Sequence, residues 1–438
     1  MSWDFETDPA YQKQLDWAAD FVRNDVEPLD YVIEHPADME DPLRNELIPP
    51  LQEEVRRRGL WATHLGPELG GPGHGQVKLA LLNEILGRSQ CAPIVFGCQA
   101  PDSGNSEILA HFGSKKLKDN YLKPLLENQI VSAFSMTEPQ GGADPNVFRT
   151  SATLDGDEWV INGQKWFSTH ARFSSFLIVM AITDPENPPR HQMSMFIVPT
   201  KTDGVRFIRN VGMGYEDGPG VEGYIEYDNV RVPTDHMLGE RSAAFAIAQT
   251  RLGGGRIHHA MRTVGLVERT FDMLCERAVS RTTQGGRLAD KQLVQGIIAD
   301  SWIQLETFRL LTMRTAWKID RFQNYKIVRG DISAVKAYMQ QVLHDVAQRT
   351  IQIHGSLGVT NEMPLVRTLV DSFVMGLADG PTEIHKLALA RHLLREVQPA
   401  PDLFPSAHVP RNREKAERKY KEILARHSEV GVGPTRSG

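Results

Sequence analysis

The sequence predicts an α+β protein with an N-terminal α-helical domain, a central antiparallel β-barrel or β-sandwich domain and a C-terminal four-helix bundle. Two changes of hydrophobic period predict this division. Apolar residues recur mostly at helical spacing over 1–130, short β-prone segments occupy 131–240, and a strong 3.6-residue period returns over 241–398. Residues 399–438 are first rich in proline and then charged, so we interpret them as a tail.

Helix signals organise the first region. Segment 77–86 is apolar enough for a buried helix. Ser106 precedes an acidic residue and an apolar run, which predicts an N-cap there, and Gly113 is the expected end of that helix. Ser114 is the expected N-cap of the next one.

Turn signals separate the β-prone segments of the middle region. Asp155-Gly156-Asp157 and Asn162-Gly163 both have the chemistry of hairpin turns. Segment 176–182 is a continuous apolar run of strand length, and 193–198 is its expected partner. Because no helical period lies between these segments, we expect an antiparallel sheet.

Four long helical stripes dominate the third region. Apolar residues step by three or four over 264–278, 294–308 and 332–346, and a last helix is expected over 382–397. Short connectors between long helices are typical of an up-down bundle.

Composition excludes several classes of protein. With 49 basic and 55 acidic residues the net charge is −6, which opposes nucleic-acid binding. The three cysteines Cys91, Cys98 and Cys275 form no CxxC pair, which excludes a disulfide scaffold and a Cys-rich zinc site. No apolar run approaches the roughly 20 residues of a membrane span. We therefore expect a soluble, cytoplasmic protein with neither a metal nor a membrane partner.

Two motifs in the middle region resemble the β-domain signatures of the acyl-CoA dehydrogenases. Residues 134–139 (FSMTEP), followed by 141–144 (GGAD), resemble the flavin-binding signature, whose usual form is close to MTEPxxGSD. Residues 162–169 (NGQKWFST) resemble the second β-domain motif of that family.

Three motifs in the helical region continue the resemblance. Residues 281–283 (RTT) with Gln292 resemble the RxxFG…Q segment, and 352–358 (QIHGSLG) resembles the QxxGGxG loop. Residues 379–385 (DGPTEIH) stand where the family has its catalytic EGT turn. All five motifs occur in family order with family-like spacing, so the resemblance also implies the acyl-CoA dehydrogenase fold.

The resemblance implies FAD as the cofactor, held by residues from two copies of the chain. Isoalloxazine contacts are expected from Phe134, Met136, Thr137, Phe167, Ser168 and Thr169. Arg281 matches the pyrophosphate arginine, and guanidinium suits phosphate by its planar fork of donors. The further cofactor positions are Gln292, Gln352, Gly355, Pro381, Thr382 and Glu383. Because the family holds the pyrophosphate largely from a neighbouring subunit, a homodimer or homotetramer is expected.

The reaction implied by the resemblance is α,β-dehydrogenation of an acyl-CoA thioester to a trans-2-enoyl-CoA. A carboxylate removes the α-proton, the β-hydrogen leaves as hydride to flavin N5, and an electron-transfer flavoprotein receives the electrons. The expected base is Asp379, one methylene shorter than the usual Glu. A second family position for the base is Gly255 here, which removes that competitor. Arg256, Ala143 and Gly380 are the expected substrate-side positions.

Alternatives stay open on the residues alone. Asp379 can be a carboxylate at a helix N-terminus and Arg281 an arginine at a helix end, while Thr137, Ser168 and Phe167 can be ordinary turn and core residues. The Asp-Gly-Pro turn resembles the branch of the mammalian ten and eleven members, which favours longer, branched or hydroxylated acyl chains. An oxidase like nitroalkane oxidase, which uses an Asp base, is a second candidate, and a non-enzymatic flavoprotein scaffold that binds nucleic acid is a third.

Overall fold

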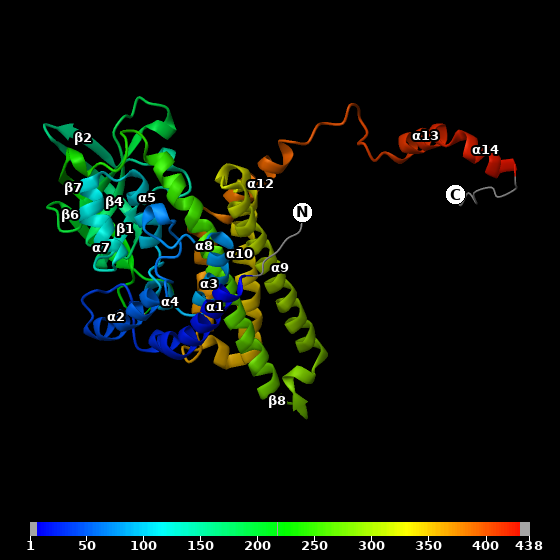
Figure 1. Cartoon of the computed structure of the whole chain (residues 1–438), viewed down its shortest axis with the longest axis horizontal. Coiled ribbons are helices and arrows are strands. Elements are labelled where there is room, and N and C mark those ends of the chain that lie inside the picture. Colours follow the sequence, from blue (N-terminus) through cyan, green and yellow to red (C-terminus); the bar gives the residue numbers. More distant parts are fainter. Residues whose placement is uncertain (1–6, 217, 430–438) are drawn as a thin grey trace. The chain divides into compact units, whose positions relative to one another are not determined.

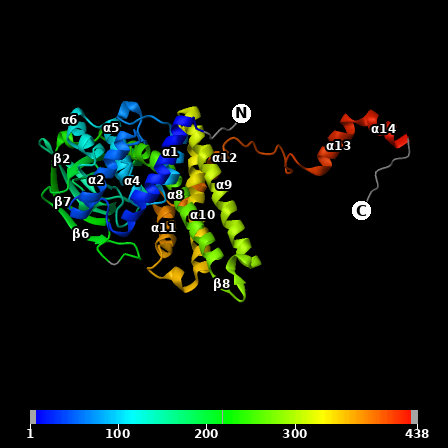
Figure 2. The ribbon, with the colours of Figure 1, turned by 60° about the horizontal axis from the view of Figure 1, so that its bottom comes forward.

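The computed structural model describes residues 7–216 and 218–429. Contacts divide the chain into two units, Met1–Leu389 and Ala390–Gly438. In the first unit the strands of the seven-stranded sheet gather on one side, and the long helices α8 (Ala244–Ser280), α9 (Gln292–Phe322) and α10 (Tyr325–His354) run side by side on the other (Figures 1 and 2). The predicted order of helices, sheet and helical bundle is confirmed.

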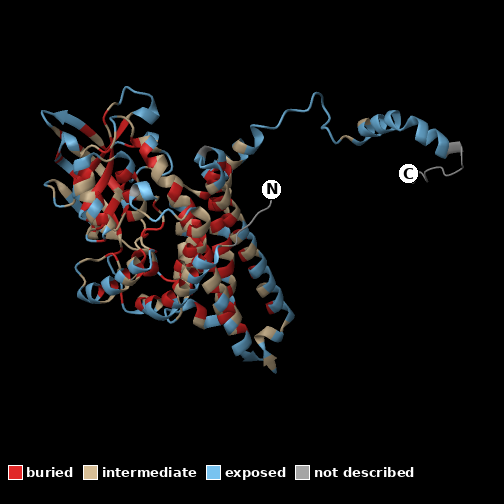
Figure 3. Cartoon of the chain, in the orientation of Figure 1, coloured by how far each residue is buried: buried red, intermediate tan, exposed pale blue. Residues whose placement is uncertain are grey.

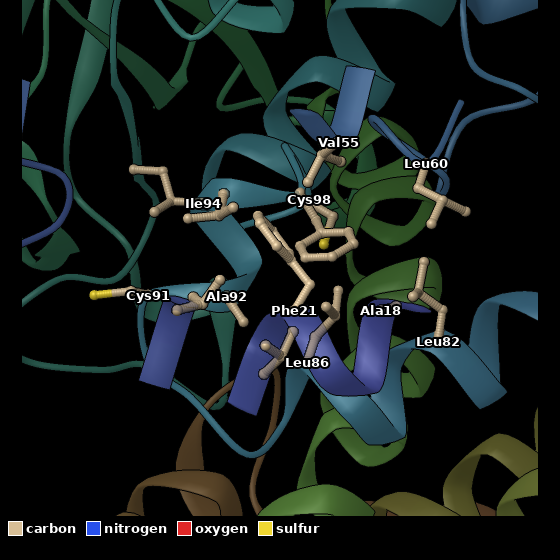
Figure 4. Packing of buried hydrophobic residues seen from close by; sticks show 14 of the residues in the cluster. Ala18, Phe21, Val55, Leu60, Leu82, Leu86, Cys91, Ala92, Ile94 and Cys98 are labelled. Atoms are coloured by element: carbon tan, nitrogen blue, oxygen red, sulfur yellow. The ribbon is translucent and has the colours of Figure 1, made fainter. Parts of the chain in front are cut away.

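Helices form the region before the first strand: α1 (Pro9–Phe21), α2 (Pro42–Arg57), α3 (Gln76–Leu86), α4 (Ala92–Val95), α5 (Asp102–Phe112), α6 (Lys115–Leu117) and α7 (Lys123–Leu126). Figure 4 shows their shared core, where Phe21 of α1 packs with Val55 of α2 and Ile94 of α4. The Ser114 N-cap is confirmed, since its hydroxyl accepts from the Leu117 N–H.

The N-cap predicted at Ser106 is wrong. Helix α5 already begins at Asp102, and Ser106 lies inside it. The Ser106 hydroxyl donates to the Ser103 carbonyl oxygen, a bond within the helix in place of a capping bond.

The sheet follows, built from β1 (Ser132–Ser135), β2 (Ser151–Asp155), β3 (Glu158–Thr169), β4 (Phe176–Ile182), β5 (Met193–Pro199), β6 (Val205–Val211) and β7 (Glu222–Pro233). Its order is β1-β4-β2-β3-β7-β6, with β5 paired to β4. Figure 3 shows that buried residues concentrate in these strands and on the facing sides of the long helices.

The sheet is mixed, although an antiparallel sheet was predicted. β1 runs parallel to β4, with Ser132 opposite Phe176, and β2 meets β4 in parallel at Ser151 and Ile182. The prediction rested on the absence of a helical period between the strands. β1 and β4 are separated by the whole β2–β3 hairpin, which acts as the crossover that a parallel pair needs.

The predicted turn at Asn162-Gly163 is wrong, whereas the turn at Gly156, with φ +66°, joins β2 to β3. Gly163 lies inside β3 at a register shift against β7. A Cβ at Gly163 would lie 2.5 Å from Thr150 Oγ1. The glycine therefore permits a bulge and a close approach rather than a chain reversal.

The bundle contains α8, α9, α10 and α11 (Leu365–Leu377), followed by α12 (Thr382–Leu394). The hairpin of β8 (Thr282–Thr283) and β9 (Gly286–Arg287) connects α8 to α9. Helix α11 was not among the predicted helices. It buries Thr368 and Ser372 while Phe373 and Leu377 are exposed, so an apolar stripe does not mark its buried face.

The tail unit has helices α13 (Val409–Lys419) and α14 (Lys421–Glu429) in its charged stretch. In the described part of the chain, no helix is both long and apolar enough to cross a membrane.

A glycine pair lets α3 approach α8 closely. A Cβ at Gly265 would lie 1.8 Å from the Glu84 carbonyl oxygen, and one at Gly87 would lie 1.8 Å from that of Arg262. Both distances are impossible for real atoms, so these positions fix how the N-terminal helices sit on α8.

We expect Gly265→Ala to lower the free energy of unfolding by about 1–3 kcal/mol, because the methyl group must push α3 away. The control is Gly296→Ala on α9, where a Cβ meets nothing within 4 Å. That change should raise stability by about 0.5–1 kcal/mol through helix propensity. Denaturant midpoints of the two variants check this, and equal shifts would contradict the close approach.

Candidate active site

The turn between α11 and α12 adopts a conformation that most residues avoid. Asp379 has φ +55° and Gly380 has φ +103°. Two side chains contact the backbone carbonyl oxygen of Asp379: Arg256 Nε donates to it at 2.9 Å, and His385 Nε2 lies 3.3 Å from it. Arg256 belongs to α8, so the turn is tied to that helix.

The Asp379 carboxyl is 14% exposed and lies between two side chains of α8. His259 Nε2 is 3.6 Å from Oδ2, and Arg251 Nη1 is 4.0 Å from Oδ1. Burial lowers the pKa of His259, so at neutral pH its ring is neutral and this contact is not an ion pair. Among the described residues, neither carboxyl oxygen accepts a hydrogen bond, which leaves Asp379 able to accept a proton.

Several cations surround this carboxyl, namely Arg251, Arg256, Arg262 and Lys336. The Lys336 ammonium donates to the Met375 carbonyl oxygen. Burial lowers the pKa of Lys336 to about 8, although Asp379 acts against that shift. The resulting positive field suits negative charge that develops on a bound substrate.

One face of α8 carries residues that lie around the Asp379 carboxyl. Arg251, Gly255, His259 and Arg262 follow at steps of four, four and three, so they share a face. A Cβ at Gly255 would lie 3.1 Å from Asp379 Oδ2. The sequence prediction named Gly255 and the neighbouring Arg256 for this site. It did not assign Arg251, His259 or Arg262 to it, and their helical spacing is the signal that could have done so.

A cavity of about 500 Å³ lies beside this face. Its walls come from α8, α11, the segment before α5 and the sheet, with His259, Arg262, Arg367, Asp371, Gln99, Ala100, His170 and Glu222 among them. Asp379 does not line the cavity itself. It lies one side chain behind the wall, in contact with His259.

Arg251 connects the turn at Asp379 to the first β-domain motif. Its guanidinium lies 4.1 Å from the centroid of the Phe134 ring, in cation–π contact. The same side chain approaches the Asp379 carboxyl. Residues 134 and 379, far apart in the sequence, therefore belong to one site.

The two β-domain motifs are fastened to each other. The backbone N–H of Trp166 donates to the Thr137 carbonyl oxygen at 2.9 Å. Lys165 Nζ donates to the Met136 carbonyl oxygen and to Glu138 Oε1, both at 2.8 Å. The Lys165 and Glu138 side chains are almost fully buried, and such a pair is costly to break, so the loop is held rigidly.

Phe167 presents a flat aromatic surface. It has φ +53° and is 51% exposed. Its ring stacks on Trp166 with centroids 5.0 Å apart, and Trp166 stacks on Tyr224 at 5.1 Å. Its packing against a flavin ring stays a prediction.

The neighbouring hydroxyls differ in what they can do. Ser168 is fully buried, and its Oγ lies 2.9 Å from that of Ser135, which also bonds Tyr227. The expected edge contact from the Ser168 side chain is therefore not available, because this hydroxyl bonds inside the sheet. Thr169 is half-buried, and its Oγ1 donates to Glu222 Oε2 at 2.9 Å.

The other expected cofactor positions lie at the far end of the bundle. Arg281, Gln292, Gln352 and Gly355 are all exposed, at the ends of α8, α9 and α10. Arg277 Nη2 donates to the His354 carbonyl oxygen at 3.5 Å, which joins two of these ends. From Arg256 to Arg281 is 25 residues, or about 37 Å along α8. Figures 1 and 2 show β8 and α12 at opposite ends of the bundle.

The remaining expected positions lie near the turn or in the loop after β1. The Thr382 hydroxyl donates to the Gly376 carbonyl oxygen at 3.2 Å and is buried, whereas Glu383 is exposed. A Cβ at Gly380 would lie 3.1 Å from His385 Nε2. Pro381 is half-buried, and Ala143 is exposed.

Two acids lie near Arg251, the buried Asp102 and the half-buried Glu107, and the sequence prediction did not name them as site residues. Arg251 Nε donates to Asn105 Oδ1 at 2.8 Å. Burial raises the pKa of Glu107 to about 7 and that of Asp102 to about 6, and in both cases Arg251 acts against the shift.

Three family models match consecutive parts of the chain. They are the N-terminal domain of acyl-CoA dehydrogenase over residues 9–129, the middle domain over 133–230 and the C-terminal domain over 245–394.

Individual relatives agree with these matches. The probable acyl-CoA dehydrogenase FadE2 of Mycobacterium tuberculosis is 39% identical, covering 83% of this chain and 92% of that protein. Human acyl-CoA dehydrogenase family member 11 is 38% identical over 80% of this chain, which spans only 45% of that longer protein. A solved Mycobacterium abscessus structure, named as an acyl-CoA dehydrogenase, is 36% identical with a TM-score of 0.82, covering 89% of this chain and 99% of that one.

We expect Glu107→Gln to flatten the dependence of stability on pH. Since the folded protein holds the Glu107 proton up to about pH 7 and the unfolded chain releases it near pH 4.5, stability falls as pH rises between these values. The variant should lose one proton's share of that slope, about 1.4 kcal/mol per pH unit. Denaturant unfolding from pH 4.5 to 8 measures this slope. A slope equal to that of wild type would refute the raised pKa of Glu107.

Proposed function

This chain belongs to the acyl-CoA dehydrogenase family, and we propose that it oxidises an acyl-CoA thioester across its Cα–Cβ bond to a trans-2-enoyl-CoA, with Asp379 as the base. The protein is an oxidoreductase and a flavoprotein, and FAD is the family's cofactor. The observation that carries the proposal is the Asp379 carboxyl, shielded from water, without a hydrogen bond among the described residues and next to a cavity wall.

The edge of the sheet fits an isoalloxazine ring. The exposed Phe167 ring and the stack beneath it offer a flat apolar surface. Two buried polar atoms there, Trp166 Nε1 and His170 Nδ1, have no hydrogen-bond partner among the described residues, so a ligand can satisfy them. Phe134, Met136, Thr137 and Thr169 complete the proposed ring site. Bound FAD supplies the hydride acceptor.

Asp379 removes the α-proton in this proposal. Its turn is fixed by Arg256 and His385, which contact the backbone rather than the carboxyl, so the carboxyl itself is left for chemistry. The Asp379 N–H donates no hydrogen bond among the described residues, and we assign it to the thioester oxygen, where negative charge develops. The surrounding cations support that charge.

The cavity beside His259 is the proposed place for the acyl group. Its wall at this end is polar, with Gln99, His259 and Arg262. A plain alkyl chain would desolvate these groups without replacing their hydrogen bonds. We therefore propose an acyl group that carries a polar substituent. This agrees with the hydroxylated acyl chains that the resemblance of the Asp-Gly-Pro turn implies.

A second copy of the chain completes the cofactor site. Arg281 and Asp379 lie too far apart for one FAD to reach both within a chain, since about 37 Å of α8 separates the two ends. We propose a homodimer or homotetramer in which Arg281, Gln292, Gln352 and Gly355 hold the pyrophosphate and adenosine half of FAD bound to the neighbouring chain. We also propose an electron-transfer flavoprotein as the acceptor, and cytoplasmic beta-oxidation as the setting.

Asp379→Asn should retain FAD and its yellow colour but lose bleaching by acyl-CoA, because the amide cannot accept the α-proton. Anaerobic titration with a panel of acyl-CoAs, followed by flavin absorbance, measures this loss. Retained bleaching would place the base elsewhere. Rapid reoxidation of the reduced wild-type flavin by air alone would favour the oxidase.

Adding Gly255→Glu to Asp379→Asn tests the same geometry by rescue. A side chain at 255 starts 3.1 Å from the position of Asp379 Oδ2, so its carboxylate can reach the α-proton. Partial return of bleaching is expected. The control is Gly253→Glu in the same background, where a Cβ meets nothing within 4 Å and no rescue is expected.

Mixed oligomers test the shared site. Arg281→Ala should weaken FAD retention on dialysis more than it alters folding, and Asp379→Asn should bind FAD without turnover. In a mixed dimer one site carries both changes and the other carries neither, so co-expression of the two chains should restore activity. No activity in mixed oligomers of confirmed composition would show that Arg281 and Asp379 serve the same chain.

A further inference from the structure

Glu222 is a buried carboxyl directly beside the proposed flavin edge. It opens β7 and lies opposite Thr169 of β3 and Val211 of β6. Glu222 is 7% exposed, and together with His170 it lines the cavity beside α8. Its side-chain partner is the Thr169 hydroxyl, 2.9 Å away, and no cation lies within ion-pair distance among the described residues.

The hydrogen bond between these two groups can run in either direction. An ionised Glu222 only accepts, so the Thr169 hydroxyl must donate to it and can offer nothing but a lone pair on its other side. A protonated Glu222 can donate to Thr169 Oγ1, which releases the threonine hydrogen for a different acceptor. The proton on Glu222 thus determines what Thr169 presents to a neighbour.

The surroundings favour a change of protonation near neutral pH. Burial raises the pKa of Glu222 to about 7, the Thr169 hydrogen bond opposes this shift, and the negative charge of Glu216 adds to it. The other titratable groups on the cavity wall are Glu34, His35, His170, Tyr215, Glu216, His259, Arg262, Arg367 and Asp371. Burial lowers the pKa of His170 to about 4, so that ring stays neutral where Glu222 titrates.

We propose that Glu222 is a positioning residue whose own proton decides whether the Thr169 hydroxyl faces the flavin as a hydrogen-bond donor or as an acceptor. The inference rests on the proposed function, since it requires the flavin edge at Thr169. An oxidised flavin ring accepts hydrogen bonds at its edge and a reduced ring donates from N5–H. The same residue pair can therefore serve both redox states if Glu222 exchanges a proton with the cavity.

The test is a pH titration of the visible absorbance of the FAD-loaded oligomer without substrate, from pH 5.5 to 9. Wild type should show a one-proton transition with a midpoint near pH 7. Glu222→Gln should lose it and keep the low-pH spectrum at every pH, since the amide N–H mimics the protonated carboxyl. Thr169→Val, of equal volume and without the hydroxyl, should also lose it, which covers failure of the first variant to fold.

Two matched controls isolate the pair. Glu226→Gln changes another carboxylate of β7, one that pairs with Arg206 outside the cavity, and should leave the midpoint unchanged. Glu216→Gln removes a like charge and should lower the midpoint while the transition remains.

A transition that persists in Glu222→Gln, or a wild-type spectrum that is independent of pH, overturns the inference. A Thr169→Val spectrum identical to that of wild type at every pH also overturns the inference, because it would show that the flavin does not contact the Thr169 hydroxyl. Bleaching by acyl-CoA in wild type, and its loss in Asp379→Asn, is independent of Glu222. Failure of this inference is therefore distinguishable from failure of the proposed function.

Discussion

The hydrogen bond from Arg256 to the backbone carbonyl oxygen of Asp379 is the constraint on which the site depends. It holds an aspartate in a left-handed conformation that costs about 1–3 kcal/mol without support. The same helix presents Arg251, Gly255 and His259 to the carboxyl. The close approach at Gly265 of α8 and at Gly87 after α3 in turn fixes α8 against the N-terminal helices. One helix therefore sets the position of the proposed base and its electrostatic surroundings.

Charge is buried in this site only where the structure gives it a partner. Lys165 and Glu138 neutralise each other and hold the loop that carries Met136. Arg251 combines a cation–π contact with an amide acceptor, which lets a guanidinium lie between an aromatic ring and a carboxyl. Among the described residues, neither Glu107 nor Glu222 has a cation within ion-pair distance, and burial raises the pKa of each to about 7. Paired groups stay fixed, while these two carboxyls can exchange protons near neutral pH.

The separation of the two proposed cofactor-binding ends follows from helix geometry. A helix rises about 1.5 Å per residue, so motifs 25 residues apart on α8 cannot meet within one chain. Exposed apolar residues on α9, such as Trp302 and Ile303, are compatible with a neighbouring subunit. The exposure of Arg281 and Gln352 then agrees with a role toward a second copy, although each would look like an ordinary surface residue in isolation.

The sequence by itself determined the order of helices, sheet and bundle, because hydrophobic period is a local property that survives without neighbours. It also indicated Asp379, Gly255 and Arg256, since their motifs are short and contiguous. The parallel pairing of β1 with β4, the bulge at Gly163 and the polar buried face of α11 were decided by tertiary contacts. The roles of Arg251, His259 and Glu222 belong to the same class. Their meaning comes from groups more than 50 residues away, or on another strand, and only packing brings such groups within hydrogen-bonding or Coulomb range.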